Sequence, residues 1–164
     1  MRAVVAGDGQ AMERLYGLTA NALFTYLRRL GSGAADADDI LQTTFLNAWR
    51  SRARFQGEGV RAWLFTIARN AYFTHASKQA IASVDPTSSV RPDTPAQHFA
   101  ATDLSRRIEA ALSELPDDTR EAVVLSRISG LSIRQIAALL DMSEGNVRVR
   151  IHRGLARLKE GLEL

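Results

Sequence analysis

The sequence predicts an all-α fold of two small helical domains joined by a flexible linker. Apolar residues recur at steps of three and four along most of the chain, which is the spacing of one helix face. No segment alternates apolar and polar residues with period two, so no sheet is expected. Residues 81–101 hold three of the four prolines and several serines, which is typical of a linker. We therefore expect domains over residues 1–80 and 102–164, with the linker between them.

Three helices are expected in the first domain. Asp8 is the predicted N-cap of the first, which ends at the Gly31-Ser32-Gly33 segment. The second is expected from Asp36 to Arg54, with Asp36 as N-cap and acidic residues in the first turn, where the helix dipole favours them. The third follows a glycine-rich break and carries an apolar face from Trp63 to Ala71.

The second domain is expected to open with a helix near Leu104. Pro116 separates this helix from the next, in which Asp117 and Asp118 lie in the first turn. That next helix is predicted to end near Ser129-Gly130, because glycine favours the conformation that follows a helix.

The last third of the chain has the pattern of a helix–turn–helix. Ser132 and Gln135 form a predicted capping box, Asp141-Met142 is the turn, and Ser143 caps a longer helix that runs to Glu160. The basic residues of this long helix are Arg148, Arg150, Arg153, Arg157 and Lys159. A basic second helix at this spacing favours binding in the major groove of DNA. An ordinary solvated basic helix is the alternative interpretation.

Charge is distributed unevenly along the 164 residues, whose formal net charge is +3. Residues 1–80 carry ten basic and six acidic side chains, and residues 143–164 carry five and three. The stretch between them is acidic, with six basic and nine acidic side chains. Two basic ends indicate two surfaces that meet one polyanion, although ordinary solvated helix faces would have the same composition.

Several functional classes are disfavoured by what the sequence lacks. The chain has no cysteine, so disulfides, thiolate nucleophiles and cysteine-ligated zinc are excluded. It contains no phosphate-binding loop and no nucleophile elbow, and its three histidines lack metal-ligand spacing. We therefore expect no enzyme, no cofactor, no metal and no small-molecule substrate. No apolar run suits a signal peptide or a membrane span, so a soluble cytoplasmic protein without membrane contact is expected.

Two separated sets of motifs resemble one known family. Residues 38–45 (DDILQTTF) and 61–70 (RAWLFTIARN) resemble conserved region 2 of the extracytoplasmic-function (ECF) sigma factors of bacterial RNA polymerase. Residues 115–122 (LPDDTREA), together with residues 131–140 and 145–158, resemble region 4. Order, spacing and the intervening linker all agree, and the resemblance covers nearly the whole chain. It implies two partners, core RNA polymerase and promoter DNA.

The resemblance also implies a role for individual residues. The polar polymerase contacts would be Asp38, Asp39 and Gln42, with Phe45 and Trp49 as further members that also fit core packing. The residues at the downstream (−10) promoter element would be Arg61, Arg69, Asn70, Tyr72, Phe73, His75 and Lys78. The residues at the upstream (−35) element would be Ser143, Asn146, Arg148, Arg150, Arg153 and Arg157. The family usually has aspartate and arginine where this chain has Thr74 and Ser77, so its −10 contacts are expected to differ.

Within the ECF group, the chain is similar to the general-stress-response sigma factors. The similar segments are residues 69–73 (RNAYF), 95–98 (PAQH) and 115–118 (LPDD). This resemblance implies a small anti-sigma factor that holds the protein inactive until a response regulator with a sigma-like domain removes it. Two alternatives stay open: a helix–turn–helix regulator that works without polymerase, and a sigma-like decoy for an anti-sigma factor.

Overall fold

The computed structural model describes residues 1–57, 59–82 and 102–162. In these ranges the chain forms eight α-helices and one 3₁₀ helix, without a strand. The first half contains α1 (Arg2–Val5), α2 (Gly9–Arg29), α3 (Ala34–Ser51), η1 (Arg52–Arg54) and α4 (Val60–Ala82). The second half contains α5 (Asp103–Ser113), α6 (Asp117–Ile128), α7 (Ile133–Leu140) and α8 (Glu144–Gly161). The predicted all-helical architecture is confirmed.

Two expectations about helix ends in the first half have opposite outcomes. Asp8 caps α2, and its carboxylate accepts hydrogen bonds from the backbone amides of Gln10 and Ala11. Asp36 was expected to cap the next helix, and this prediction is wrong because Gly33 is the N-cap of α3. The Asp36 carboxylate instead accepts a hydrogen bond from Gln79 Nε2 on α4, at 3.0 Å.

Other boundaries differ from the expectation by a few residues. α3 ends at Ser51, and the three residues up to Arg54 form η1 instead of continuing the α-helix. α4 extends through Ala82, two residues into the segment expected to be a linker, and residues 83–101 of that segment lie outside the described residues. The short helix α1 carried no sequence signal.

The helix–turn–helix of the second half has the helix caps that the sequence predicts. The Ser132 side chain accepts from the amide of Gln135, and the Gln135 side chain accepts from the amide of Ser132, so the capping box at the start of α7 is formed. Asp141 closes α7 in the left-handed conformation, with φ of 53°. Ser143 then caps α8 by accepting from the amide of Asn146 at 3.2 Å.

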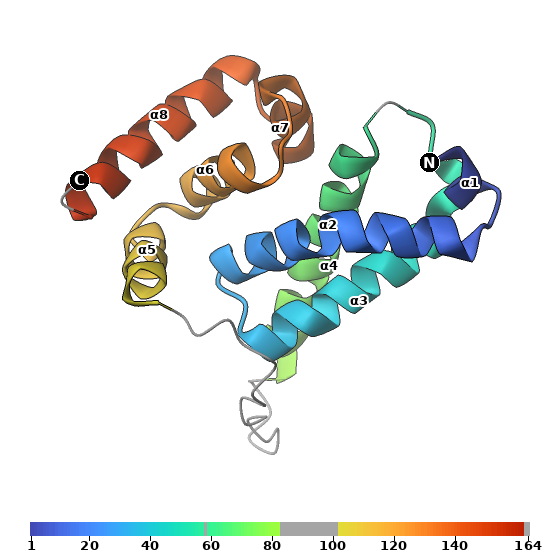
Figure 1. Ribbon diagram of the computed structural model, residues 1–164. Coiled ribbons are helices and arrows are strands. Elements are labelled where there is room, and N and C mark those ends of the chain that lie inside the picture. The colour runs from blue at the N-terminus through green and yellow to red at the C-terminus, as the bar shows by residue number, and fades with distance from the viewer. Residues whose placement is uncertain (58, 83–101, 163–164) are drawn as a thin grey trace.

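The two halves pack side by side, and one buried cluster of apolar side chains continues through both. In Figure 1, α6 lies between α8 and α2. α2 contacts α6, and α4 contacts α7. The first-half core is built around Leu23, Tyr26 and Phe65, all fully buried. This arrangement places α8 on the outer side of the second half and leaves the two halves in direct contact.

None of the described helices has both the length and the apolar character that a membrane span requires. The described residues also contain no group of three or more histidine or acidic side chains arranged to hold a metal ion.

Candidate polymerase and promoter interfaces

α8 presents one buried face to its own half and one basic face outward. Val147 is fully buried, and Gly154 is buried against α6. The exposed side chains predicted for the −35 element are Ser143, Asn146, Arg148, Arg153 and Arg157. Arg148 makes an ion pair of 3.2 Å with Glu144, one turn earlier on the same helix. α8 therefore has the exposed cationic surface that a recognition helix in the major groove needs.

Arg150 differs from the other arginines of α8. Its guanidinium forms an ion pair with Asp118 of α6 and is about one third exposed. A guanidinium held by a carboxylate of the neighbouring helix is less available to DNA. Three arginines at this spacing on a helix cannot all face one way, so different roles were expected for Arg148, Arg150 and Arg153, but the pairing of Arg150 with Asp118 was not predicted.

The turn between α7 and α8 is fixed by backbone geometry. The amide of Met142 donates to the carbonyl of Ala137 at 2.9 Å, and Ala137 is 5% exposed. Gly154 lets α8 approach α6 closely, because a methyl group there would lie 2.5 Å from Val123 Cγ2. This role of Gly154 was not predicted from the sequence, since a glycine inside a helix has no unique local meaning.

α3 carries the residues predicted to bind polymerase. Asp39 and Gln42 are exposed and Asp38 is partly exposed, all on the side away from the core. Leu46, which the sequence analysis did not select, is 56% exposed. Leu46 lies one turn after Gln42 and two turns after Asp39 on the same helix. The outward face of α3, formed by Asp39, Gln42 and Leu46, therefore has an apolar side chain beside two polar ones.

The two aromatic residues predicted on α3 are less accessible. Phe45 is 9% exposed, and its ring lies 4.7 Å from the ring of Tyr16 on α2. Trp49 is partly buried, with the guanidinium of Arg52 4.1 Å from the centre of its ring. Phe45 therefore packs in the core, which was the alternative to its predicted contact with polymerase.

The residues predicted at the −10 element all lie on α4, but their surroundings differ. Asn70, Phe73 and Lys78 are exposed. The hydroxyl of Tyr72 donates to the carbonyl of Leu30 at 3.0 Å, and burial is the main cause that raises the Tyr72 pKa. His75 Nε2 lies 3.6 Å from the carboxylate of Asp36. The exposed phenyl ring of Phe73 and the Lys78 ammonium have the chemistry to bind single-stranded DNA, by base stacking and phosphate pairing.

The remaining two predicted −10 residues are bound by the second half. Arg69 Nε and Nη2 donate to the two carboxylate oxygens of Glu121 at 2.9 and 3.3 Å. Arg61 Nε donates to the carbonyl of Ser129, at the end of α6, at 2.9 Å. Neither contact has a local sequence signal, because the partners lie more than fifty residues away.

Glu121 also accepts a hydrogen bond of 2.6 Å from the hydroxyl of Tyr26, in the buried centre of the interface. Burial, together with the adjacent Glu121 carboxylate, raises the pKa of Tyr26 well above its ordinary value. We call Tyr26, Arg69 and Glu121 the interdomain cluster. Three polar groups from α2, α4 and α6 thus satisfy one another between the halves.

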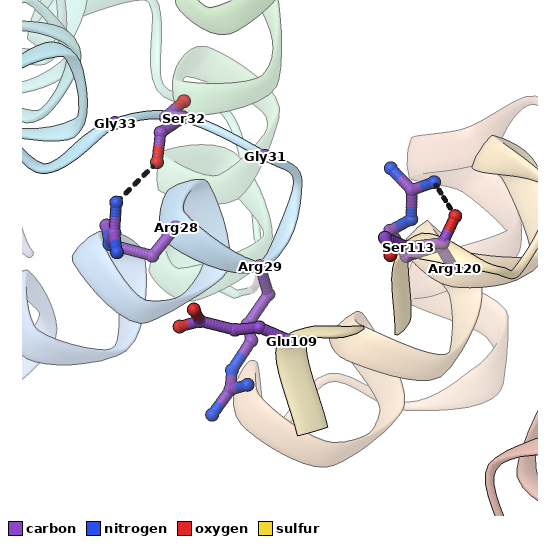
Figure 2. Close-up of a pocket in the computed structure, with 8 residues that line it drawn as sticks. All are labelled: Arg28, Arg29, Gly31, Ser32, Gly33, Glu109, Ser113 and Arg120. Atoms are coloured by element: carbon purple, nitrogen blue, oxygen red, sulfur yellow. Dashed lines mark hydrogen bonds between the residues drawn. The ribbon is translucent and has the colours of Figure 1, made fainter. Parts of the chain in front are cut away.

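A notch of about 240 Å³ lies between the two halves, where the end of α2 and the following loop face α5 (Figure 2). Arg28 donates to the carbonyl of Ser32, and Arg120 donates to the carbonyls of Leu112, Ser113 and Leu115. Two of the three lining arginines, Arg28 and Arg120, therefore bind backbone carbonyls near helix ends, whereas Nη1 of the third, Arg29, is buried without a hydrogen-bond partner among the described residues.

An exposed basic helix held in a helix–turn–helix, in one chain with a second helical domain, defines an all-helical DNA-binding protein of two domains. Residues 15–81 match the family model for Sigma-70 region 2, and residues 105–158 match that for Sigma-70, region 4. The RNA polymerase sigma factor CarQ of Myxococcus xanthus is 40% identical over 94% of this chain and 90% of its own length. The ECF RNA polymerase sigma factor SigL of Mycobacterium tuberculosis is 32% identical over 96% of this chain and 92% of its own.

Two solved structures resemble the whole chain. The sigma factor RpoE of Bartonella quintana, in complex with the anti-sigma factor NepR, matches with a TM-score of 0.78 at 30% identity, over 94% of this chain and 98% of that one. CnrH, in complex with the cytosolic domain of CnrY, matches with a TM-score of 0.73 at 27% identity, over 99% and 94%.

The chain belongs to the ECF family of RNA polymerase sigma factors. It is therefore a subunit that binds core RNA polymerase and directs the initiation of transcription at promoters, and it is not itself an enzyme. The family predicted from the sequence is confirmed. A polymerase-independent helix–turn–helix regulator does not account for the match to Sigma-70 region 2 over residues 15–81.

Proposed function

We propose that the protein recognises a promoter of two elements, with α8 at −35, α4 at −10 and the outward face of α3 on core polymerase. The observation that carries this division is the outward basic face of α8, held over α7 by the capped turn. Arg148 and Arg153 are exposed, whereas Val147 of the same helix is buried. On α4, exposed Asn70 and Phe73 supply amide and aromatic groups for an unpaired base.

Polymerase docking is assigned to Asp39, Gln42 and Leu46 on α3. Protein interfaces concentrate their binding energy in a central apolar side chain surrounded by polar contacts, and Leu46 provides such a centre. The polymerase surface that fits this face has basic groups around an apolar depression, by charge complementarity. As a polymerase subunit, the protein would act in the cytoplasm.

In vitro transcription with core polymerase on a randomised promoter pool tests the promoter assignment. The expected result is enrichment of templates with two short conserved elements, one of which changes its preference when α8 is altered. Enrichment of a single element, or transcription that does not depend on the added protein, would contradict it.

We further propose control by a small anti-sigma factor within a general stress response. The support is the likeness to RpoE bound to NepR, which spans both halves of this chain and therefore includes their relative placement. The motifs at residues 69–73 and 115–118 favour the same group. These two motifs include Arg69 and the start of α6, which lie at the contact between the halves.

Copurification of the tagged protein from its native cells tests the proposed control. A small helical partner that blocks binding to core polymerase is the expected result. Recovery without any inhibitor, or with a membrane-anchored inhibitor alone, would contradict the stress-response assignment and leave membership of the ECF family unaffected.

A further inference from the structure

Glu121 is an acidic residue buried among groups from the other half of the protein. It is 5% exposed, and its carboxylate is bound by Tyr26 and Arg69, which precede it by 95 and 52 residues. Both partners belong to the first half, while Glu121 belongs to α6 of the second. If the halves separate, all three polar groups gain water and lose one another.

The same contact occupies the start of the proposed −10 surface. Arg69 is bound by Glu121, and Arg61 is bound by the carbonyl of Ser129. At Gly59, just before α4, an added methyl group would lie 2.8 Å from Gln135 Nε2 of α7. The carboxylate of Glu121 thus takes the place beside Arg69 that a DNA phosphate would need, and α7 covers the adjoining backbone.

The span of a promoter requires the halves to part. Elements centred near −35 and −10 are about 25 base pairs apart, or roughly 85 Å at the rise of B-form DNA. In the closed arrangement α2 touches α6 and α4 touches α7, so the two DNA-binding surfaces cannot be that far apart. Residues 83–101 join the halves in sequence, and nineteen residues can span at most about 65 Å. The widths of the two halves add to this length, so the chain is long enough for the halves to separate and reach both promoter elements.

A buried ion pair suits an interface that must open. Replacing such a pair by apolar side chains often leaves stability unchanged or increases it, so the pair is not needed for tight packing. An apolar replacement would, however, expose its surface to water whenever the halves separate. A carboxylate and a guanidinium are instead well solvated in the open state, so the closed state is specific and reversible.

We propose that Glu121 is an internal competitor of promoter DNA: it neutralises Arg69 in a closed free protein and releases it when the halves separate on polymerase. This inference rests on the proposed role of Arg69 at the −10 element. A free chain that is mostly closed binds −10 DNA weakly in proportion to its open fraction. Polymerase binding removes this penalty, because the open form is then the populated one.

The test compares wild-type protein with Glu121→Gln, which removes the charge and keeps the shape. The chain has no natural cysteine, so Asn21→Cys on α2 and Ala156→Cys on α8, both exposed, allow two fluorophores to be attached to the full-length protein. Energy transfer between them should fall in Glu121→Gln, and affinity of the free protein for a single-stranded −10 oligonucleotide should rise about tenfold. Glu114→Gln, an exposed substitution in the same half, is the matched control and should leave both measurements unchanged.

Tyr26→Phe provides a second test if Glu121→Gln loses helix content by circular dichroism. It removes the hydroxyl that binds Glu121 and keeps the ring packed edge-on against Phe65, 5.3 Å away. The same changes in the same direction are expected, at about two- to threefold in DNA affinity. Unchanged energy transfer in both variants, or opening without any gain in DNA affinity, would overturn the proposal.

Transcription by the complete holoenzyme tests the role of Arg69 at the −10 element separately from its competition with Glu121. Glu121→Gln should transcribe as wild type once core polymerase is bound, because opening is then already complete. Arg69→Ala should lose −10-dependent transcription in the same assay. Normal transcription by Arg69→Ala would remove Arg69 from the promoter interface, whatever the energy-transfer result for Glu121→Gln.

Discussion

Gly154 of α8 lies directly against Val123 of α6, and no larger residue fits between them. A methyl group on Gly154 would meet Val123 Cγ2 at 2.5 Å and Thr119 Cγ2 at 3.0 Å. The position of the recognition helix on its own half therefore depends on this close approach.

Gly154→Ala should destabilise the second half. Overpacking costs about 1–3 kcal/mol, and the better helix propensity of alanine offsets roughly 1 kcal/mol of this. Chemical denaturation monitored by circular dichroism measures the net change. Gly161→Ala on the same helix, where the methyl group would be 3.9 Å from Ala111, is the control and should not destabilise the protein. Equal stabilities of the two variants would contradict the close-approach argument.

The outward face of α3 should be required for polymerase binding. Asp39→Lys combined with Gln42→Lys should weaken core binding at least about tenfold, because the polar contacts become repulsive to a basic partner surface. Leu46→Ala should weaken it separately, by about 1–2 kcal/mol. Binding to core polymerase is measured by competition, with circular dichroism to verify folding. Glu114→Lys in the other half is the charge control, and normal affinity of the folded α3 variants would exclude this face.

Arg148 is expected to contact a base, since it lies near the start of α8 with its side chain exposed. Arg148→Ala should cost about 1–3 kcal/mol at one promoter position and leave the other positions unchanged. Arg157→Ala, near the other end of the helix, should weaken binding to all sequences alike. Affinities for a set of single-base −35 variants distinguish the two results. An Arg148→Ala protein with wild-type affinity and preference would show that this assignment is wrong.

Stability should fall at high pH because of Tyr26. Its pKa in the folded protein is raised above 10.0, mainly by burial and then by Glu121, while Arg69 opposes and Tyr72 adds to the shift. The folded state therefore holds this proton more tightly than the unfolded state. The resulting stabilisation is complete below about pH 10 and is lost as pH rises through the folded pKa.

Denaturation of the wild type and Tyr26→Phe between about pH 8 and pH 11 measures this effect. Tyr26→Phe should be less stable at pH 8, by about 1.5–3 kcal/mol for a hydrogen bond to a charged group, and should show a shallower decline above pH 10. Tyr72, whose pKa is also raised, accounts for part of the remaining decline. Parallel pH profiles of the two proteins would contradict the assignment to Tyr26.

We propose that the domain limits are near residues 80 and 102, and limited proteolysis tests this. The first cuts in the free protein should fall between residues 81 and 101, where proline and serine are concentrated. Because α4 extends through Ala82, cleavage is expected after that residue. First cuts within α2 to α4 or within α6 to α8 would contradict the division.

Local signals predicted most of the helices, because a cap and its amide or an apolar stripe involve residues within a few positions of each other. Asp8, the Ser132–Gln135 capping box and Ser143 all form the expected caps. The prediction for Asp36 failed because capping residues near a helix start are locally equivalent. Asp36 instead accepts a hydrogen bond from Gln79, forty-three residues later, which no local pattern indicates.

The sequence by itself determined the fold class, the helix–turn–helix and the sigma-factor family. Only the tertiary structure decided that Glu121 binds Tyr26 and Arg69, that Arg150 pairs with Asp118, and that Leu46 is exposed while Phe45 is buried. The physical reason is the sequence distance over which each kind of interaction acts. Helix periodicity and capping act over one or two turns, whereas a buried ion pair between residues 52 positions apart depends on how completed helices pack, which no local pattern encodes.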